Sequence, residues 1–295
     1  MEKLGFIGTG GMGSLMATNL INAGFGLSVF DAKREATGAL EEKGAAYAES
    51  PRAVAESSTI VLSMLPFGTT VKEVGLGTNG LVDAASGARI WLDLSSVEQQ
   101  AIIDVDRVLK PKGWTVLDGS VGGVEEHAAD GKLSIRLAGD KSAVERIRPF
   151  LAPVGNKITY CGVLGNAKAL KTATAIYSAI NAMGIVEIFN WLKSCGISEG
   201  VSHDVFKDSL FYSESMRRVC ERIEDKTFKP RKSWTPKDVG FGLQSAQEIG
   251  VPMPLTTLVQ QLFNVARSNA LDGYEATGIA YKVYERLGNG EKKNN

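Results

Sequence analysis

The stretch GFIGTGGMGSLMATNLINAG, residues 5–24, decides the fold of the first half of this chain. Its glycines Gly8, Gly10 and Gly13 follow the spacing GxGxxG, directly after an apolar, strand-like run and at the start of an amphipathic, helix-like segment. A second apolar run then ends at Asp31, 18 residues after Gly13. The glycine spacing alone is weak, because 33 of the 295 residues are glycine. The order of strand, turn, helix and strand around it predicts a dinucleotide-binding βαβ unit.

Each of these positions has a physical role in holding a dinucleotide. Gly8 permits a tight turn, Gly10 lets the backbone approach a pyrophosphate at the helix N-terminus, and Gly13 lets helix and strand pack closely. Asp31 is expected to accept hydrogen bonds from the adenosine ribose, and its charge favours NAD, although the basic residues after it keep NADP possible. The alternative is a glycine-rich turn that holds no cofactor. We predict cofactor contacts here at Gly8, Thr9, Gly10, Gly11, Met12, Gly13 and Asp31.

The composition is that of a globular protein, with 44% hydrophobic and 22% charged residues. Basic and acidic residues both number 33, so the overall charge gives no reason to expect a nucleic acid or an acidic membrane as partner. The three cysteines are widely spaced and form no CxxC pair, which favours neither a disulfide framework nor a metal site. The chain starts without the features of a secretory signal, and no run of 18 apolar residues follows. We expect a cytoplasmic protein with a small-molecule substrate, no metal, no nucleic acid and no membrane partner.

Strand-like and helix-like segments alternate through the first half of the chain. Such alternation requires crossover connections, and it predicts a parallel sheet covered by helices on both faces. A further strand-like pair flanks a helical run at residues 141–150. The expected strands are residues 3–8, 26–31, 59–65, 88–94, 114–119, 133–138 and 157–161.

After Cys161 the strand signals stop, and a helical pattern runs from about residue 166 to 193. That is a helix of about 42 Å at 1.5 Å per residue, too long for one domain of modest helices to cover on both sides. We therefore expect a second subunit, in a homodimer or homotetramer. Shorter helices are expected near 200–210, 213–224, 236–249 and 255–270, with a polar tail at 288–295. The predicted class is α/β: a Rossmann, doubly wound parallel sheet at 1–163, then an all-helical substrate-binding and oligomerisation domain at 164–295, joined by the long helix.

Four segments follow the glycine-rich turn in an order that resembles the β-hydroxyacid dehydrogenases, the family of 3-hydroxyisobutyrate dehydrogenase and tartronate semialdehyde reductase. DLSS at residues 93–96 resembles the family's DxST segment, and residues 118–133 match its DAPVSGG stretch in length. GVLGNAKALK at 162–171 and WTPKDV at 234–239 resemble its catalytic-lysine and KDL segments. The resemblance covers nearly the whole chain.

The resemblance implies hydride transfer between a nicotinamide and a hydroxyacid or semialdehyde, with Lys171 as the catalytic acid or base. The ordinary pKa of lysine, about 10.4, must then fall, or the side chain must act mainly by hydrogen bonding to a developing oxyanion. His127 and His203 are weaker candidates, because neither falls on a family motif. Lys168, three residues before Lys171, is either a solvated charge or a neighbour that supports the site.

The resemblance also implies a set of binding residues beyond the glycine-rich turn. Further cofactor contacts are expected at Leu65, Pro66, Ser96 and Lys237, with a plain helix start as the alternative for the segment of Lys237. Substrate contacts are expected at Ser95, Ser96, Ser120, Gly122, Gly123, Val124, Lys171, Thr174 and Ala175.

The chain departs from the family at several of these substrate positions. Thr174 and Ala175 stand where the family has two asparagines, on the helix face of Lys171. Gly122 stands where the family has the serine that helps to hold the substrate carboxylate. We predict a roomier, less polar pocket and a bulkier substrate, or one without the usual carboxylate arrangement. Two alternatives remain open: an imine reductase-like enzyme, against which the lysine argues, and a non-catalytic nucleotide-binding and oligomerisation module.

Overall fold

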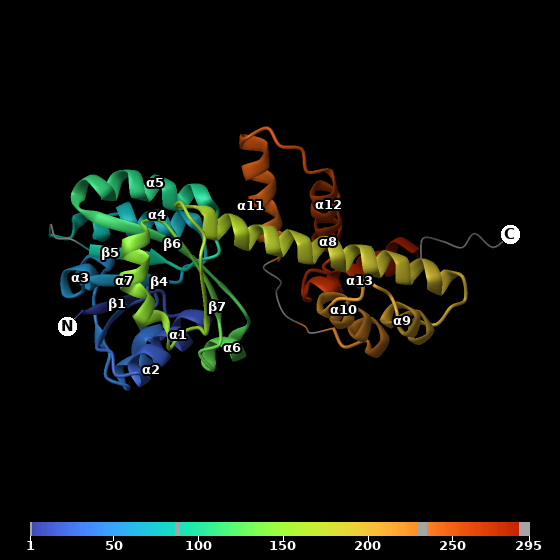
Figure 1. The fold of residues 1–295 in the computed structure, drawn as a ribbon, viewed down its shortest axis with the longest axis horizontal. Helices are drawn as coiled ribbons and strands as arrows, with labels where there is room; N and C mark the ends of the chain where they lie inside the picture. The colour runs from blue at the N-terminus through green and yellow to red at the C-terminus, as the bar shows by residue number, and fades with distance from the viewer. Residues whose placement is uncertain (1, 86–88, 229, 231–234, 289–295) are drawn as a thin grey trace. The chain divides into compact units, whose positions relative to one another are not determined.

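The computed structural model describes residues 2–85, 89–228, 230 and 235–288 of the chain. It divides into two compact units, Met1–Lys171 and Thr172–Asn295 (Figure 1). The division falls inside the long helix α8, Asn166–Ser194, so the sequence-based boundary at residue 163 stays a prediction. The expected polar tail at 288–295 lies almost entirely outside the described residues.

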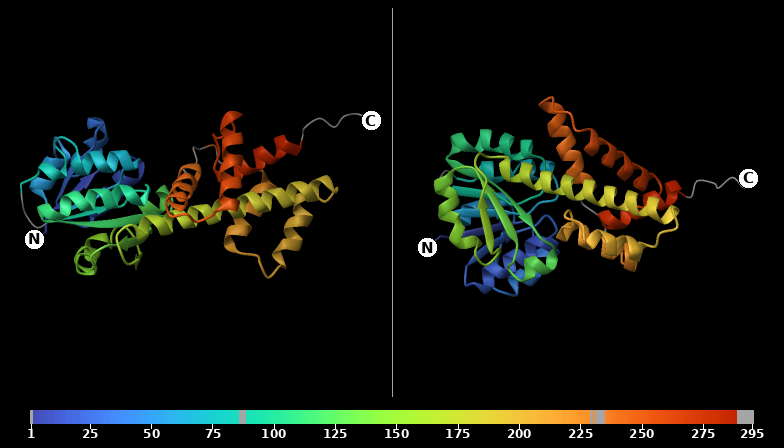
Figure 2. Two further views of the ribbon diagram at one scale, coloured as in Figure 1. Left: turned by 90° about the horizontal axis from the view of Figure 1, so that it is seen from above. Right: turned by 45° about the vertical axis from the view of Figure 1, so that its right-hand side comes forward.

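An eight-stranded sheet forms the centre of the first unit, in the order β3-β2-β1-β4-β5-β6-β7-β8. Central strands such as β1 and β4 are buried on both faces, as expected for a sheet covered by crossover helices. Figures 1 and 2 show helices on both sides of it. The strands are β1 (Leu4–Ile7), β2 (Leu27–Phe30), β3 (Ala46–Tyr47), β4 (Ile60–Ser63), β5 (Arg89–Asp93), β6 (Trp114–Gly122), β7 (Ser134–Ala138) and β8 (Lys157–Tyr160).

Two hydrophobic cores hold the helices against this sheet. Phe6 of β1 packs on one face with Met16 and Leu20 of the first helix. Trp91 of β5 packs on the other face with Val105 of the helix that follows it. The helices of this unit are α1 (Gly11–Asn22), α2 (Gly38–Glu41), α3 (Pro51–Ser57), α4 (Gly68–Leu76), α5 (Gln99–Leu109), α6 (Glu125–Ala129) and α7 (Lys141–Leu151), with 3-10 turns at Arg34–Thr37, Leu81–Asp83 and Lys110–Lys112.

The sheet is parallel except at one junction. Strand β7 runs antiparallel to β6, with Ser120 opposite Arg136 and Gly122 opposite Ser134. Strand β8 is parallel to β7, and α7 connects the two. The sequence pattern located this last βαβ unit but not its reversed direction, because strand periodicity is the same in either orientation.

Helices make up the regular structure of the described part of the second unit. Beyond α8 they are α9 (Glu199–Lys207), α10 (Glu214–Asp225), α11 (Thr235–Glu248), α12 (Pro254–Ser268) and α13 (Ala276–Gly288). The expected helices match α9 to α12, while α13 was missed. Its buried residues, Ile279, Ala280 and Val283, have helical spacing and join the core around Phe189 and Phe263.

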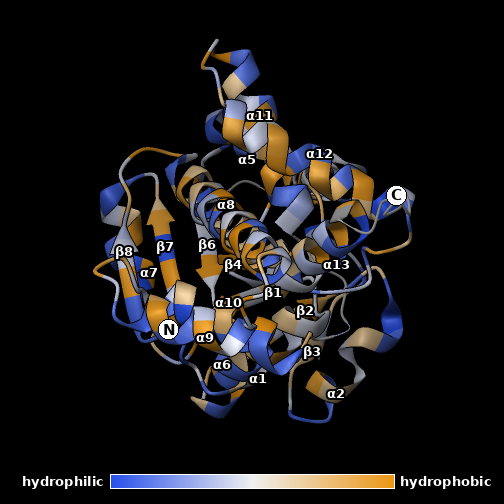
Figure 3. Ribbon diagram, turned by 90° about the vertical axis from the view of Figure 1, so that its right-hand side faces the viewer, coloured by the Kyte–Doolittle hydropathy of each residue, from blue (hydrophilic) through white to orange (hydrophobic). Residues whose placement is uncertain are grey.

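Helix α8 is long and apolar enough to cross a membrane by length and composition alone (Figure 3), and 33% of its most apolar window is buried. One such helix is weak evidence, since core helices pass the same test. The helix contains no uninterrupted run of 18 apolar residues, since polar residues such as Ser178, Asn181 and Glu187 lie within it.

Candidate active site

The glycine-rich turn between β1 and α1 has the geometry that a dinucleotide requires. Gly8 has φ +90°, and a Cβ on it would lie 2.4 Å from the carbonyl oxygen of Met64. A Cβ on Gly13 would lie 1.9 Å from the carbonyl oxygen of Gly8, so only glycine permits this close packing of helix and turn. A Cβ on Gly10, the residue that precedes α1, would meet nothing within 4 Å. The turn is tight on its inner side and open at the helix N-terminus, where a pyrophosphate fits.

Asp31 follows β2 and fixes this turn to the sheet. Its carboxylate accepts hydrogen bonds from the backbone N–H of Thr9 at 2.7 Å and of Lys33 at 2.9 Å. Arg34 is engaged elsewhere: its guanidinium makes two hydrogen bonds with Glu41 and lies 3.9 Å from the ring centre of Tyr47. The charge of Arg34 is thus balanced by Glu41 within the segment, while Lys33 is exposed.

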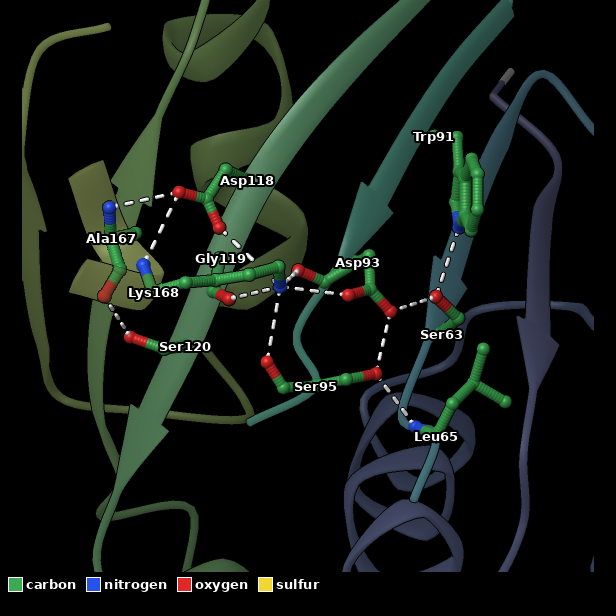
Figure 4. A network of polar contacts seen from close by, with 10 residues as sticks. All are labelled: Ser63, Leu65, Trp91, Asp93, Ser95, Asp118, Gly119, Ser120, Ala167 and Lys168. Carbon is green, nitrogen blue, oxygen red and sulfur yellow. Dashed lines mark hydrogen bonds and ion pairs between the residues drawn. The ribbon is translucent and has the colours of Figure 1, made fainter. Parts of the chain in front are cut away.

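The carboxyl end of β5 and the middle of β6 meet around a buried ammonium group, that of Lys168 (Figure 4). Its Nζ donates to Oδ2 of Asp93 at 2.8 Å and to the carbonyl oxygen of Ser95 at 3.0 Å, and lies 3.4 Å from Oδ1 of Asp118. None of the three charged side chains is exposed to solvent. Lys168 is therefore not a solvated charge. Of the two alternatives for this residue, only a neighbour that supports the site remains.

Two hydroxyl groups extend the network from Asp93 toward β4. Ser63 and Ser95 both donate to Oδ1 of Asp93, at 2.7 and 2.6 Å. The hydroxyl of Ser95 also accepts the backbone N–H of Leu65 at 2.7 Å, and that of Ser63 accepts the indole N–H of Trp91 at 2.9 Å. The carboxylate of Asp93 and the two hydroxyls are thus all hydrogen-bonded, as is usual for buried polar groups.

Asp118 caps the N-terminus of α8 from a neighbouring strand. Its Oδ2 accepts the backbone N–H groups of Ala167 at 2.8 Å and Lys168 at 3.3 Å, which would otherwise lack partners at a helix start. Burial raises the pKa of Asp118 against the influence of the ammonium group and these N–H donors. Burial acts to lower the pKa of Lys168, but the two carboxylates together raise it, so this lysine stays protonated at neutral pH.

The hydroxyls of Ser95 and Ser120, predicted as substrate contacts, are engaged inside the protein. Both residues are completely buried. Ser95 makes the hydrogen bonds described above, and Ser120 donates to the carbonyl oxygen of Ala167 at 2.9 Å. These hydroxyls hold α8 and the strands together. Ser96, the next residue, is half-buried and stays a predicted contact.

Two polar groups lie next to Gly122, where the sequence predicts a less polar pocket. A Cβ on this residue would lie 2.5 Å from the hydroxyl oxygen of Ser134 and 3.4 Å from Nη1 of Arg136. A guanidinium group therefore lies beside the residue that replaces the family's serine. Gly123 follows with φ +137°, and the backbone N–H of Val124 donates to the ring of His127 at 3.3 Å.

The remaining predicted residues lie on exposed or half-buried helix and loop surfaces. Lys171 and Ala175 are half-buried on α8, and Thr174 is exposed beside them. Leu65 is buried and Pro66 exposed after β4, and Met12 packs against the core at the start of α1. In the second unit, Lys237 lies in the first turn of α11 with its Nζ 5.4 Å from the ring centre of Phe241.

Outside this site, the second candidate histidine has a structural role. His203 is buried between Glu224 at 2.5 Å and the hydroxyl of Tyr212 at 2.8 Å, which is a satisfied core histidine. The described residues contain no group of three or more histidine, cysteine or carboxylate side chains that could hold a metal ion. A cavity of about 160 Å³ near Arg89 and Thr115 lies at the amino ends of β5 and β6, opposite the glycine-rich turn.

Comparison with known families identifies both halves of this architecture. Residues 3–162 match the NAD binding domain of 6-phosphogluconate dehydrogenase. Residues 165–283 match the NAD-binding domain of NADP-dependent 3-hydroxyisobutyrate dehydrogenase. The chain belongs to the β-hydroxyacid dehydrogenase family. Like its relatives, it is an NAD(P)-dependent oxidoreductase.

Individual members of the family are similar over almost their whole length. The chain is 32% identical to the 2-hydroxy-3-oxopropionate reductase of Escherichia coli, covering 90% of this chain and 92% of that one. The solved structure of 3-hydroxyisobutyrate dehydrogenase from Mycobacterium tuberculosis with L-serine has 25% identity and a TM-score of 0.88, covering 96% and 99%. An imine reductase from Myxococcus stipitatus shares the fold at 15% identity and a TM-score of 0.67, with coverages of 96% and 99%.

Replacing Lys168 by methionine should destabilise this dehydrogenase by about 3–5 kcal/mol, because two buried carboxylates lose their counter-charge. Urea unfolding followed by tryptophan fluorescence measures the loss. Lys193→Met on the same helix is the matched control: its ammonium is 56% exposed and 3.7 Å from Glu199, so about 1 kcal/mol or less is expected. Equal losses in the two variants would contradict the role of the buried network.

The deficit of Lys168→Met should shrink as the pH falls from 7 toward 4. Burial already raises the pKa of Asp118 above 3.8, and removing the ammonium raises it further. The folded variant then binds protons more tightly than the unfolded chain, so its stability increases as the pH falls through the raised folded pKa toward the unfolded one. Unfolding free energies at pH 7 and pH 5, for wild type and variant, test this. A deficit that is independent of pH would refute it.

Proposed function

We propose that the chain oxidises a small hydroxyacid, or reduces the corresponding semialdehyde, with NAD as the preferred cofactor and Lys171 as the acid or base. The observation that carries this proposal is the anchoring of α8. Lys168 and Asp118 bind the first turn of the helix to the carboxyl end of β5 and to the adjoining residue of β6, and Lys171 follows one turn later. In open α/β sheets this edge is where ligands bind.

In the proposed mechanism, hydride transfer, proton transfer and positioning are carried out by different groups. The nicotinamide, when bound, accepts or supplies the hydride. Lys171 takes the hydroxyl proton during oxidation and returns one to the carbonyl oxygen during reduction. Lys168, held by two carboxylates and buried, moves no proton and keeps the turn that presents Lys171 in place. A positioned lysine is thus provided without histidine.

The preference for NAD rests on the charges after β2. Asp31 presents a carboxylate where an adenosine ribose would lie, and it would repel a 2′-phosphate. Arg34, which could offset that repulsion, is already paired with Glu41. The backbone hydrogen bonds from Thr9 and Lys33 keep the carboxylate in this position.

An imine reductase-like activity is the second candidate. It is supported by the shared fold and by the missing asparagines at Thr174 and Ala175, but the lysine at 171 argues against it. A cyclic imine in the substrate panel distinguishes the two candidates. The third possibility, a non-catalytic module, predicts cofactor binding without turnover of either substrate class.

We further propose a cytoplasmic homodimer or homotetramer without a membrane or nucleic-acid partner, in which a second subunit covers part of α8. Tyr177, Ile188 and Trp191 share one face of this helix and are 66%, 44% and 63% exposed. Large apolar side chains gathered on one face are typical of an interface.

Replacing Lys171 by alanine should lower kcat by about 10²- to 10⁴-fold, because a positioned proton donor contributes about that much. NADH absorbance with tartronate semialdehyde, succinic semialdehyde and 3-hydroxyisobutyrate measures the loss, and Lys193→Ala on the same helix is the control. The dissociation constant of NADH should not change. Activity that survives Lys171→Ala would remove the catalytic assignment.

Replacing Asp31 by asparagine should lower the preference for NADH over NADPH by about tenfold, or about 1.4 kcal/mol. The reason is that the uncharged amide no longer repels a 2′-phosphate. Fluorescence titration of both cofactors gives the ratio of dissociation constants. Glu35→Gln, a nearby exposed carboxylate, should leave that ratio unchanged; the assignment of Asp31 fails if both variants change it equally.

A further inference from the structure

Arg136 lies in the middle of β7, a strand whose neighbours otherwise fit a buried sheet. Ile135 and Leu137 point into the hydrophobic core, so Arg136 points to the opposite face. Its cross-strand partner is Ser120, whose hydroxyl contacts the start of α8. The guanidinium therefore lies on the sheet face that carries Asp118, Ser120 and Gly122.

The guanidinium has no protein partner among the described residues. Its Nη1 is shielded from solvent and makes no hydrogen bond, and within those parts of the chain no carboxylate pairs with it. The nearby backbone of Gly122 provides the space: Nη1 lies 3.4 Å from where a Cβ would stand. Any side chain at position 122 would compete with the guanidinium and with the hydroxyl of Ser134 for this space.

The Arg136 side chain is half-buried, and a shielded N–H donor such as Nη1 is costly in a folded protein when it has no acceptor. Arginine cannot escape this cost by losing its proton. An anionic ligand beside it would supply the missing acceptor. The position of Arg136 agrees with a role in binding a ligand. Gly122, beside it, is the last residue of β6, and ligands bind at the carboxyl edge of such sheets.

We propose that Arg136 binds an oxyanion group of the substrate, a carboxylate or phosphate, beside Gly122. This inference rests on the proposed function for the identity of the ligand as substrate. The planar guanidinium offers two parallel N–H donors to such a group. At position 122 this chain lacks the family's serine side chain. In the proposed site the charged donor Arg136 on β7 replaces that neutral donor on β6.

Binding of simple anions to the NADH-loaded protein tests the site directly. Isothermal titration calorimetry with malonate, inorganic phosphate and uncharged malonamide should show binding of at least one anion and none of malonamide. Arg136→Gln should weaken anion binding by at least about tenfold, as expected when one member of a shielded charge pair is removed. Arg148→Gln is the control, because that arginine is paired with Glu145 on α7. Tighter binding of malonate identifies a carboxylate site, and tighter binding of phosphate identifies a phosphate site.

Stability separates a ligand role from a structural one. Without anion, Arg136→Gln should have an unchanged or higher Tm, because the variant loses an unpaired cation and no contact. A clear fall in Tm would overturn the inference. Arg136→Lys keeps the charge without the two-pronged geometry, and it should bind anions with intermediate affinity.

Turnover separates this inference from the proposed function. Arg136→Gln should lower kcat/KM for tartronate semialdehyde at least about tenfold more than for uncharged glyceraldehyde. Equal losses on both aldehydes would overturn the role of Arg136 and leave the dehydrogenase function intact. Absence of turnover, together with anion binding that depends on Arg136, would overturn the function and leave the anion site. The inference is also overturned if wild type and Arg136→Gln bind each anion with the same affinity, or if neither protein binds an anion.

Discussion

The buried ion pairs of Lys168 with Asp93 and Asp118 are the constraint on which the rest of the first unit depends. They join the end of β5 and the middle of β6 to the first turn of α8 with no charge exposed to water. Removing any one member leaves the others buried without compensation. The network also fixes Ser95 and, through it, the backbone of Leu65, so the strand ends and the helix start behave as one rigid body.

This rigidity is what a hydride-transfer site needs, since reacting groups must be held in one geometry. The glycine-rich turn is held in the same way, with Asp31 binding the N–H of Thr9 and Gly13 packed onto Gly8. Most polar side chains near the predicted site thus form hydrogen bonds within the protein that hold the turn and the helix start in place. The groups that we propose as ligand contacts are the backbone N–H groups at the start of α1, Lys171, and the guanidinium of Arg136.

The alternation of apolar runs and helical segments was enough to predict the Rossmann unit and the long helix, because both depend on local patterns. The strand reversal at β7 and helix α13 were not predicted, since pairing direction has no local signature and α13 lacks clear start signals. Asp93 and Asp118 lie in buried strands, and Lys168 lies in a run of small residues; these charged residues among apolar ones could have revealed the network. Exposure was misjudged for Ser95 and Ser120, because a hydroxyl is as easily an internal anchor as a ligand contact.

The reversed strand β7 has a consequence for how selectivity can change in this fold. A parallel strand reaches the ligand edge only with its last residue, and loops supply the rest. Because β7 begins at that edge, its first residues lie beside the proposed anion site, while the backbone stays fixed in the ladder with β6 and β8. A substitution there alters recognition without the conformational entropy that a loop must lose on binding. Single substitutions on β7 can therefore change substrate selectivity while the backbone of the strand stays fixed.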